Sequence, residues 1–472
     1  MYMLRILSQG DRERIHGTGM RVLAEVGVRI LDGDIYRMVA EAGGIPDEKD
    51  KNALRFPDKM VKKYLALCPK RFTLRDRGGV TDVVESGGKP LYLTSNGITY
   101  SRGASKKAVD IGEKEFVEFV RVVDKLDNVG AIVGTSLADY PPQARDYAGF
   151  MLMAQYTDKH LRPCIYTPSG AETIIEMADV ILDGKSLRDN MFFTLGYSVV
   201  SPLTWSRTAL ELFYKTRGHG IPLMINSEPM AGGTSPVTLA GSLAMADAEV
   251  ISGIVVNQII EPGRPCVYNA GFAHVMDMLT ATVLTGSPEN ALLQAAGAEM
   301  AAYHGLPCAS WALSEALSLD SQASYEKMMT LLAHTLANVN LIWGVGNIET
   351  SKTISPEAAV IDNEMIGNCL RFAAGIKVDD DRLAFDIIKE TGFGGNFLET
   401  DHTMEHFREE LRSSRLPNRE HRIMWERKGS KTVDEKAADT VNGILSAKTD
   451  YYLTGAQMEK MEKIKNKKMS NI

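Results

Sequence analysis

Short apolar runs recur along the chain from residue 131, and each ends in polar or glycine residues before a helical segment. The seven runs cover residues 131–142, 162–170, 191–202, 221–229, 265–272, 306–314 and 341–350. Repeated strand–helix units predict parallel strands with helical crossovers. Because polar residues follow nearly every strand, the pattern favours an α/β fold of the closed (β/α)8 TIM-barrel type over an open doubly wound sheet. Residues 91–95 and 370–378 are alternative candidates for the eighth strand.

The barrel pattern has a flank on each side. Residues 1–90 read as an N-terminal mixed α/β appendage, residues 91–400 as the barrel domain, and residues 401–472 as a charged C-terminal helical segment. Capping patterns predict where the barrel helices begin. The predicted starts are at Ser169, Ser235, Ser287, Asp320 or Ser321, and Ser355.

Residues 221–242 read as a strand, a loop and a helix start. The strand ends at Asn226 and Glu228, and the glycine pair Gly232 and Gly233 lets backbone approach a ligand. A helix beginning at Ser235 would present free N–H groups to an anion such as a substrate carboxylate.

Composition narrows the class of protein. The chain has 472 residues, of which 44% are hydrophobic and 24% charged, as expected of a globular protein. Its formal net charge of −7 argues against a nucleic-acid partner. The N-terminus lacks a signal-peptide pattern and no apolar run spans a membrane, so we expect a cytoplasmic protein without a membrane partner. Five scattered cysteines fit reduced thiols.

One metal motif is present. His402, Glu405 and His406 match H-x-x-E-H, in which two histidines of one helix bind zinc. A third ligand must come from elsewhere, and Glu435 and Glu459 have no supporting context. We therefore interpret the two histidines as helix-face residues packing against the barrel, and expect no bound metal. A metal-dependent hydrolase or lyase using Glu228, His274 or the His402 pair remains the alternative.

Aromatic residues gather at or just past the predicted strand ends. They are Tyr100, Tyr140, Tyr166, Tyr197, Trp205, Tyr268, Phe272, Trp311 and Trp343. Each alone is more often wall packing, but together they suggest a cage for an organic cation, worth about 0.5–2 kcal/mol per ring face. Arg207 is a candidate partner for an anionic group on the same ligand. Polar groups expected on this rim are Asn226, Glu228, His274, Asp320, Gln322, Asn347 and Glu349.

Residues 232–265, 305–308 with 320–326, and 397–411 resemble the trimethylamine methyltransferase family, and the resemblance runs over nearly the whole chain. It implies a barrel enzyme that moves a methyl group from an amine to the cobalt of a corrinoid on a separate protein. The archaeal trimethylamine enzymes carry pyrrolysine, whereas every residue here is standard. The chain thus resembles the branch that acts on quaternary amines such as glycine betaine, proline betaine or carnitine.

The resemblance also implies roles for the rim residues. The corrinoid-binding motif D-x-H-x-x-G has only an imperfect match at Asp158, His160 and Pro163, so we expect the corrinoid (cobalamin) to arrive with its partner protein. No general acid is needed, because a quaternary nitrogen leaves as a neutral amine. A betaine-binding protein without catalysis is the second alternative, and a homo-oligomer is left open.

The substrate site is expected to use two groups of rim residues. We expect the ammonium to lie among Tyr100, Tyr197, Trp205, Phe272, Trp311 and Trp343, and the carboxylate to bind at Arg207 or Ser235. Asn226, Glu228, Asp320 and Gln322 are expected to form the catalytic pocket or contact the corrin, and Gly232, Gly233, His274 and Asn347 to make further cofactor contacts.

Overall fold

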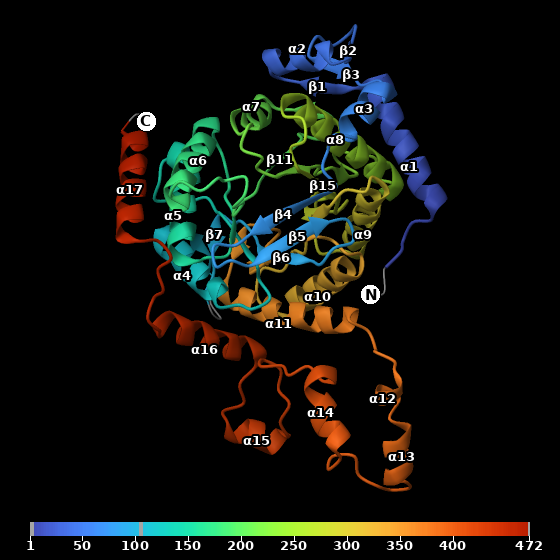
Figure 1. Cartoon of the computed structure of the whole chain (residues 1–472), viewed down its shortest axis with the longest axis vertical. Helices are drawn as coiled ribbons and strands as arrows, with labels where there is room; N and C mark the ends of the chain where they lie inside the picture. The colour runs from blue at the N-terminus through green and yellow to red at the C-terminus, as the bar shows by residue number, and fades with distance from the viewer. Residues whose placement is uncertain (1–3, 103–106, 471–472) are drawn as a thin grey trace.

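The computed structural model describes residues 4–102 and 107–470 (Figure 1). Eight parallel strands form one sheet, in the order β10-β9-β6-β19-β18-β15-β13-β11. Their bounds are β6 (Leu91–Thr94), β9 (Ala131–Val133), β10 (His160–Arg162), β11 (Leu195–Ser198), β13 (Leu223–Asn226), β15 (Cys266–Gly271), β18 (Cys308–Trp311) and β19 (Leu341–Val345). Leu161 pairs in parallel with Phe193, which joins the two end strands. The sheet closes, and the predicted (β/α)8 fold is confirmed.

Helices surround the barrel on its outside (Figure 1). They are α4 (Glu113–Asp124), α5 (Arg145–Tyr156), α6 (Pro168–Leu182), α7 (Arg207–Lys215), α8 (Leu239–Ile260), α9 (Pro288–Tyr303), α10 (Ser321–Leu336) and α11 (Pro356–Ala373). The eighth strand is β6, as one of the two candidates had it. The other candidate, residues 370–378, lies at the end of α11 and beyond it.

Three helix starts were predicted correctly and two were not. Ser287, Asp320 and Ser355 cap α9, α10 and α11. Ser235 does not begin α8, because its carbonyl accepts a hydrogen bond from Gly232 N (3.1 Å) and closes a turn; α8 begins at Leu239. The cap of α6 is Thr167, not Ser169, because Pro168 occupies the first helical position.

The helix α8 is long and apolar enough to cross a membrane by composition alone, but 78% of that window is buried inside the protein. It packs on β15 and carries α1 (Gln9–Arg21) and α3 (Asp58–Leu65) on its outer side. Its apolar character is therefore that of a core helix.

The N-terminal segment also contacts the barrel through its strands, in addition to the packing of α1 and α3 on α8. Its other elements are a π-helical turn (Val22–Val26), β1 (Val28–Ile30), α2 (Gly33–Glu41), β2 (Ile45–Pro46), β3 (Ala53–Arg55), β4 (Arg71–Arg75) and β5 (Thr81–Glu85). The strand β12 (Thr204–Trp205) pairs with β1 and so extends the N-terminal sheet. The β4–β5 hairpin reaches the start of β10 and β11, where Arg75 N donates to Met191 O (2.8 Å). It covers the N-terminal ends of these strands.

Short strands lie beyond the opposite, C-terminal ends of the barrel strands. One sheet combines β14 (Met230–Ala231), β16 (His274–Met276) and β17 (Val283–Leu284), and another combines β20 (Asn347–Ile348), β21 (Thr353–Ile354), β7 (Thr99–Tyr100) and β8 (Val109–Asp110). These strands order the loops that follow the barrel strands, so the loops are held by backbone hydrogen bonds.

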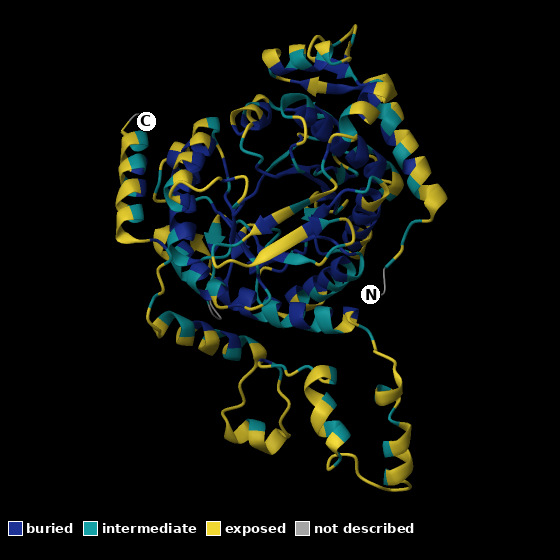
Figure 2. Ribbon diagram, viewed as in Figure 1, coloured by how far each residue is buried: buried dark blue, intermediate teal, exposed yellow. Residues whose placement is uncertain are grey.

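The C-terminal helices divide into a packed pair and a projecting arm. The pair consists of α16 (Val433–Ser446), which packs on α11 and α4, and α17 (Gly455–Met469), which packs on α6 and α5. Residues 376–431, here called the C-terminal arm, hold α12 (Asp380–Leu383), α13 (Phe385–Thr391), α14 (Asp401–Glu410) and α15 (Arg422–Arg427). These four helices contain no buried residue, and the arm extends away from the barrel (Figure 2).

Candidate active site

The two-residue period of the strands separates interior from exterior side chains. Tyr268 and Ser310 hydrogen-bond residues of α8 and α10, so both face the helix layer. Their neighbours Asn269 and Trp311 therefore face the barrel interior. Both lie toward the C-terminal ends of their strands, where the active sites of TIM-barrel enzymes are found.

Three aromatic rings form a connected group in this interior, here called the aromatic trio: Phe272, Trp311 and Trp343. The ring of Phe272 stacks on Trp311, with centroids 4.3 Å apart and planes inclined by 14°. The ring centroids of Phe272 and Trp343 lie 5.1 Å apart, with planes inclined by 67°. Within the described chain, neither indole N–H of the trio has a hydrogen-bond partner. The trio thus combines π faces with unpaired donors.

A buried arginine lies against the trio. Arg162 on β10 places its guanidinium 5.1 Å from the ring centroid of Trp343 on β19. Because β9 and β6 separate these two strands in the sheet, the contact crosses the barrel interior. The guanidinium donates to the carbonyls of Pro163 (2.6 Å) and Gly196 (3.0 Å). A side chain at Gly196 would collide with Met224 and with this guanidinium, so the glycine makes room for both residues.

No carboxylate of the described residues compensates the charge of Arg162. Burial lowers the pKa of its guanidinium. Among residues 4–102 and 107–470, no carboxylate pairs with it, and its Nε lacks a hydrogen-bond partner. A buried charge without a counter-ion is destabilising, whereas one paired with a ligand carboxylate is not. Arg162 is therefore suited to hold an anionic group.

Polar side chains continue the interior on β11, β13 and β15. Ser198 Oγ donates to Glu228 Oε1, and Asn269 Nδ2 donates to Asn226 Oδ1 (2.8 Å). Burial raises the pKa of Glu228, and the hydrogen bond from Ser198 opposes this rise. Asn269 Oδ1 is buried with no partner in the described residues. The interior therefore offers unpaired polar atoms as well as aromatic faces.

The loops behind these residues are fixed by one carboxylate of α8. Glu249 accepts hydrogen bonds from Ser227 Oγ (2.5 Å), Ser201 Oγ (2.8 Å) and Leu203 N (2.8 Å). These donors belong to the segments that follow β11 and β13. Glu249 thereby sets the positions of Ser198 and Glu228 from outside the barrel.

The structure brings together one group of the predicted site residues. These are Asn226, Glu228, Phe272, Trp311, Trp343 and, beside them, His274. The imidazole of His274 lies 6.2 Å from the Trp311 ring, and its Nδ1 lies 2.9 Å from the carbonyl oxygen of Phe272. Burial lowers the pKa of His274, so its ring favours the neutral form.

Other predicted aromatic and basic residues lie elsewhere. Trp205 is fully buried under α8, where its Nε1 donates to Ser252 Oγ (2.9 Å). Tyr197 faces α7, and Tyr100 donates to Glu118 of α4 (2.9 Å). Arg207 is exposed and pairs with Glu211 (2.8 Å). The contacts of these four residues do not connect them to the aromatic trio.

The remaining predicted residues have structural contacts. Asp320 caps α10, and Gln322 donates to Glu326 (2.9 Å) in the same helix. Asn347 is buried and accepts from Ser351 N (2.9 Å), which holds the turn between β20 and β21. Gly232 lies in the turn after β14 with φ +91°, a conformation that favours glycine, and Gly233 and Ser235 complete this turn.

Sequence reasoning missed Arg162, Ser198 and Asn269. Arg162 carried a readable signal, since a charged residue beside a buried apolar run is uncommon unless it has a partner or a ligand. The interior orientation of Ser198 and Asn269 depends on strand register, which the sequence pattern did not give.

Comparison with known proteins identifies the family. The family model described as trimethylamine methyltransferase matches residues 1–472. The chain belongs to the trimethylamine methyltransferase family. It is 32% identical over 423 residues to the trimethylamine methyltransferase of Methanosarcina barkeri, covering 85% of this chain and 83% of that protein. It is 28% identical over 427 residues to the glycine betaine methyltransferase of Desulfitobacterium hafniense, covering 89% and 88%.

Solved structures support the fold of this family member. The monomethylamine methyltransferase of Methanosarcina barkeri superposes with a TM-score of 0.50 at 13% identity, covering 78% of this chain and 81% of that chain. At this identity the likeness concerns the fold alone. With the family established, the protein is a methyltransferase, and its barrel interior is the candidate active site.

The family implies a corrinoid, so the imperfect motif around His160 can be tested against the structure. His160 is buried near the N-terminal end of its strand, with Nδ1 2.9 Å from Arg75 O and Nε2 3.4 Å from Thr194 Oγ1. Burial lowers the pKa of His160 to about 4. Both nitrogens are engaged inside the protein, so this motif does not fit a corrinoid ligand.

Proposed function

We propose that this methyltransferase removes a methyl group from a quaternary amine that bears a carboxylate, of the glycine betaine class. The methyl group passes to the corrinoid of a separate partner protein, and a tertiary amine is released. The observation that carries the proposal is Arg162, a buried cation in the barrel interior that pairs with no carboxylate in the described part of the chain. Trimethylamine has no carboxylate and would leave this cation unpaired, whereas a betaine would neutralise it.

The two charges of a betaine find opposite partners in this interior. The carboxylate pairs with Arg162. The ammonium contacts the faces of the aromatic trio, since a desolvated cation is attracted to aromatic rings by about 2 kcal/mol. Glu228, when ionised, adds a negative charge on the same side of the substrate as Asn226 and Asn269.

The proposed reaction requires the substrate to be positioned and does not require proton transfer. A quaternary nitrogen already carries positive charge and leaves as a neutral amine, so the chain needs no acid at this step. The partner's corrinoid supplies the nucleophile that accepts the methyl group. Arg162 and the trio hold the substrate in one orientation, which is the principal contribution of a site of this kind.

The rim of the barrel offers a surface for that partner. Val200, Val237, Leu279 and Leu317 belong to loops that follow β11, β14, β16 and β18, and all four are largely exposed. Exposed apolar residues around one opening are typical of protein docking sites. A partner bound there would place its cofactor over the trio.

A substrate panel with reduced cobalamin tests the proposal by absorbance. The panel contains glycine betaine, choline, trimethylamine and dimethylglycine. We expect transfer from glycine betaine and little from the other three, since choline and trimethylamine lack the carboxylate and dimethylglycine lacks the quaternary nitrogen. Preference for trimethylamine would contradict the proposal, and calorimetric binding of betaine without any transfer would indicate a binding protein.

Arg162→Met provides the matched variant. Loss of a charge-assisted contact should lower kcat/KM for betaine by about 10- to 100-fold, corresponding to roughly 1.5–3 kcal/mol. Arg207→Met, at an exposed arginine, should leave the rate unchanged. Equal activity of both variants would remove Arg162 from the substrate site.

A further inference from the structure

The H-x-x-E-H motif gains a third residue in the folded chain. His402 and His406 lie one turn apart on α14, with ring centroids 4.4 Å apart. Asp381 of α12 meets them, and one ligand atom from each of the three residues lies within 4.8 Å of the others. The sequence could not identify this residue, because it precedes the motif by 21 residues in a different helix.

Both histidines of this group approach Asp381, and only His406 does so without a hydrogen bond. His402 Nε2 lies 3.2 Å from the backbone carbonyl oxygen of Asp381. His406 Nε2 lies 3.0 Å from Asp381 Oδ2. Yet this nitrogen is inaccessible to solvent and makes no hydrogen bond of acceptable geometry with any described residue. Two ligand atoms on a tetrahedral zinc ion with bonds of about 2.0 Å are roughly 3.3 Å apart, close to this separation.

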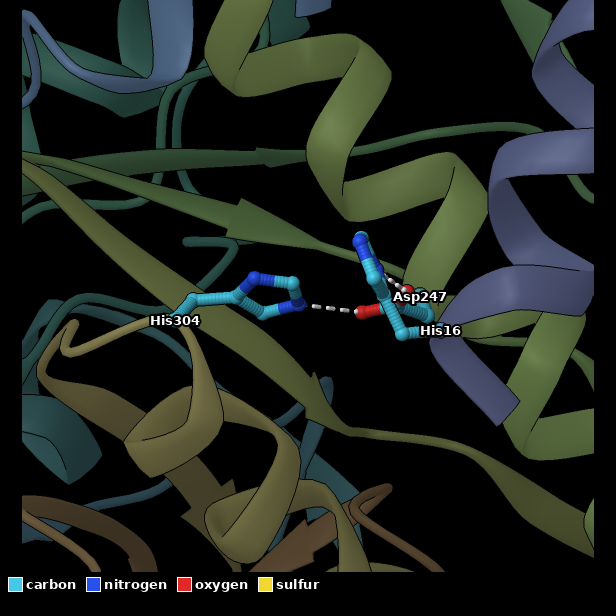
Figure 3. A group of neighbouring side chains, drawn as sticks. All are labelled: His16, Asp247 and His304. Atoms are coloured by element: carbon cyan, nitrogen blue, oxygen red, sulfur yellow. Dashed lines mark hydrogen bonds and ion pairs between the residues drawn. The ribbon is translucent and has the colours of Figure 1, made fainter. Parts of the chain in front are cut away.

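A second His–Asp–His group offers a contrast. Asp247 of α8 lies between His16 of α1 and His304 at the end of α9 (Figure 3). There His304 Nε2 and Tyr268 OH approach one carboxylate oxygen at 2.9 and 2.7 Å, and His16 Nδ1 approaches the other at 3.2 Å. Hydrogen bonds account for that group without a metal. They do not account for His406 Nε2.

The helices of the C-terminal arm have no core of their own, and the arm is tied to α11 mainly by polar contacts of Arg371 with Glu410 (2.9 Å) and of Arg412 with Asn368 (2.8 Å), with Leu416 buried beside them. The helices α12 to α15 bury no side chain. The links between α12 and α14 include ion pairs of Arg382 with Glu409 (2.9 Å) and Glu410 (3.2 Å), and solvent-accessible pairs of this kind contribute little. Small units without a core are commonly stabilised by a metal ion or a disulfide.

We propose that Asp381, His402 and His406 bind a divalent transition-metal ion of the zinc class, with water in the remaining position. The ion joins α12 to α14 and orders the C-terminal arm. Two imidazoles and a carboxylate suit Zn²⁺ and related ions better than Ca²⁺ or Mg²⁺, which prefer oxygen ligands. The role is structural and independent of the methyl-transfer site.

Metal binding to the full-length protein tests the proposal. The protein is treated with a chelator, Zn²⁺ is added back, and bound metal is measured by mass spectrometry and by competition with a chromogenic chelator. We expect one Zn²⁺ per chain. Asp381→Asn, His402→Gln and His406→Gln should each weaken binding by more than the roughly 10- to 100-fold typical of residues behind the ligands.

Two control variants locate the ion. His421→Gln changes another histidine of the arm and should bind zinc like the wild type. His16→Gln alters the group around Asp247 and should also have no effect. Unchanged zinc binding in the three ligand variants, less than one site per wild-type chain, or loss of zinc in His16→Gln would each overturn the proposal. Circular dichroism confirms that the barrel of each variant is folded.

Discussion

Arg162 and Glu228 place opposite charges inside the barrel, near the aromatic trio and the amides of Asn226 and Asn269. Neither charge pairs with the other in the described contacts: Arg162 donates to carbonyl groups and Glu228 accepts from Ser198. Each buried charge without a counter-ion costs stability. Such a cost is expected where a ligand later supplies the missing partners, and a zwitterion supplies both.

Replacing Glu228 with glutamine should weaken the binding of the ammonium end. Burial raises the pKa of Glu228, so the carboxyl becomes protonated earlier than usual as the pH falls. Wild-type affinity for betaine should therefore decrease as the pH falls through this raised pKa. Glu228→Gln should bind betaine about tenfold more weakly than the wild type at high pH, as expected for losing a contact of roughly 1.4 kcal/mol. The affinity of this variant should not decrease further as the pH falls. Calorimetry at several pH values measures both effects.

The same substitution should not destabilise the fold. A carboxyl whose pKa is raised in the folded state binds its proton more tightly there, so its contribution to stability decreases as the pH rises through that pKa. Glu228→Gln should thus be at least as stable as the wild type at pH 8. Glu211→Gln, on the exposed side of α7, is the matched control and should leave affinity unchanged. Equal affinity of the Glu228 and Glu211 variants would argue against a substrate contact.

At the scale of elements, α8 connects the N-terminal segment to the barrel and to the active-site loops. Asp247 joins it to α1 through His16 and to the end of α9 through His304 (Figure 3). Gly19 of α1 allows a close approach, since a side chain there would lie 3.0 Å from Asp247. Two residues after Asp247, and so about half a turn around the helix, Glu249 holds the loops after β11 and β13. Both faces of α8 therefore carry buried carboxylates with assigned partners.

Asp247→Asn should lower the free energy of unfolding at pH 7 by about 3 kcal/mol, because it leaves the buried partners of a charged group uncompensated. Burial alone would raise the pKa of Asp247, but nearby His304 and the hydrogen bonds from His16, His304 and Tyr268 hold it well below 3.8. Urea unfolding measures the difference. Asp34→Asn, which changes an exposed carboxylate paired with Arg37, should have almost no effect.

The pKa of Asp247 also determines how the difference in unfolding free energy between wild type and Asp247→Asn changes with pH. A carboxylate with a depressed pKa contributes stability that is fully present above its unfolded value of 3.8 and is lost as the pH falls through the lower folded value. The gap between wild type and Asp247→Asn should therefore persist from neutral pH down to 3.8 and narrow only below it. A gap that closes by pH 6 would contradict this assignment to Asp247.

On the scale of the whole molecule, the sequence predicted what is set locally. Alternating strands and helices gave the barrel, and a Ser–Pro pair marked the starts of α9 and α11. The sequence pattern did not predict contacts between segments that lie far apart in the chain. Trp205 and Trp311 both follow apolar runs, but pairing of β12 with β1 draws Trp205 under α8. The contact of Arg162 with Trp343 requires the closed barrel, and the approach of Asp381 to His406 requires the folded arm.

Limited digestion with trypsin should cut first in the C-terminal arm. The exposed residues Lys389, Arg415 and Arg427 lie there, and α12 to α15 bury no side chain, so local opening of this segment costs little. The fragments should remain associated, because α16 and α17 pack on the barrel helices. Mass spectrometry after size-exclusion chromatography identifies the cuts. Added Zn²⁺ should slow cleavage in the wild type and not in Asp381→Asn. Early cuts within the barrel, or release of the C-terminal fragment, would contradict this division of the chain into a stable barrel and a weakly held arm.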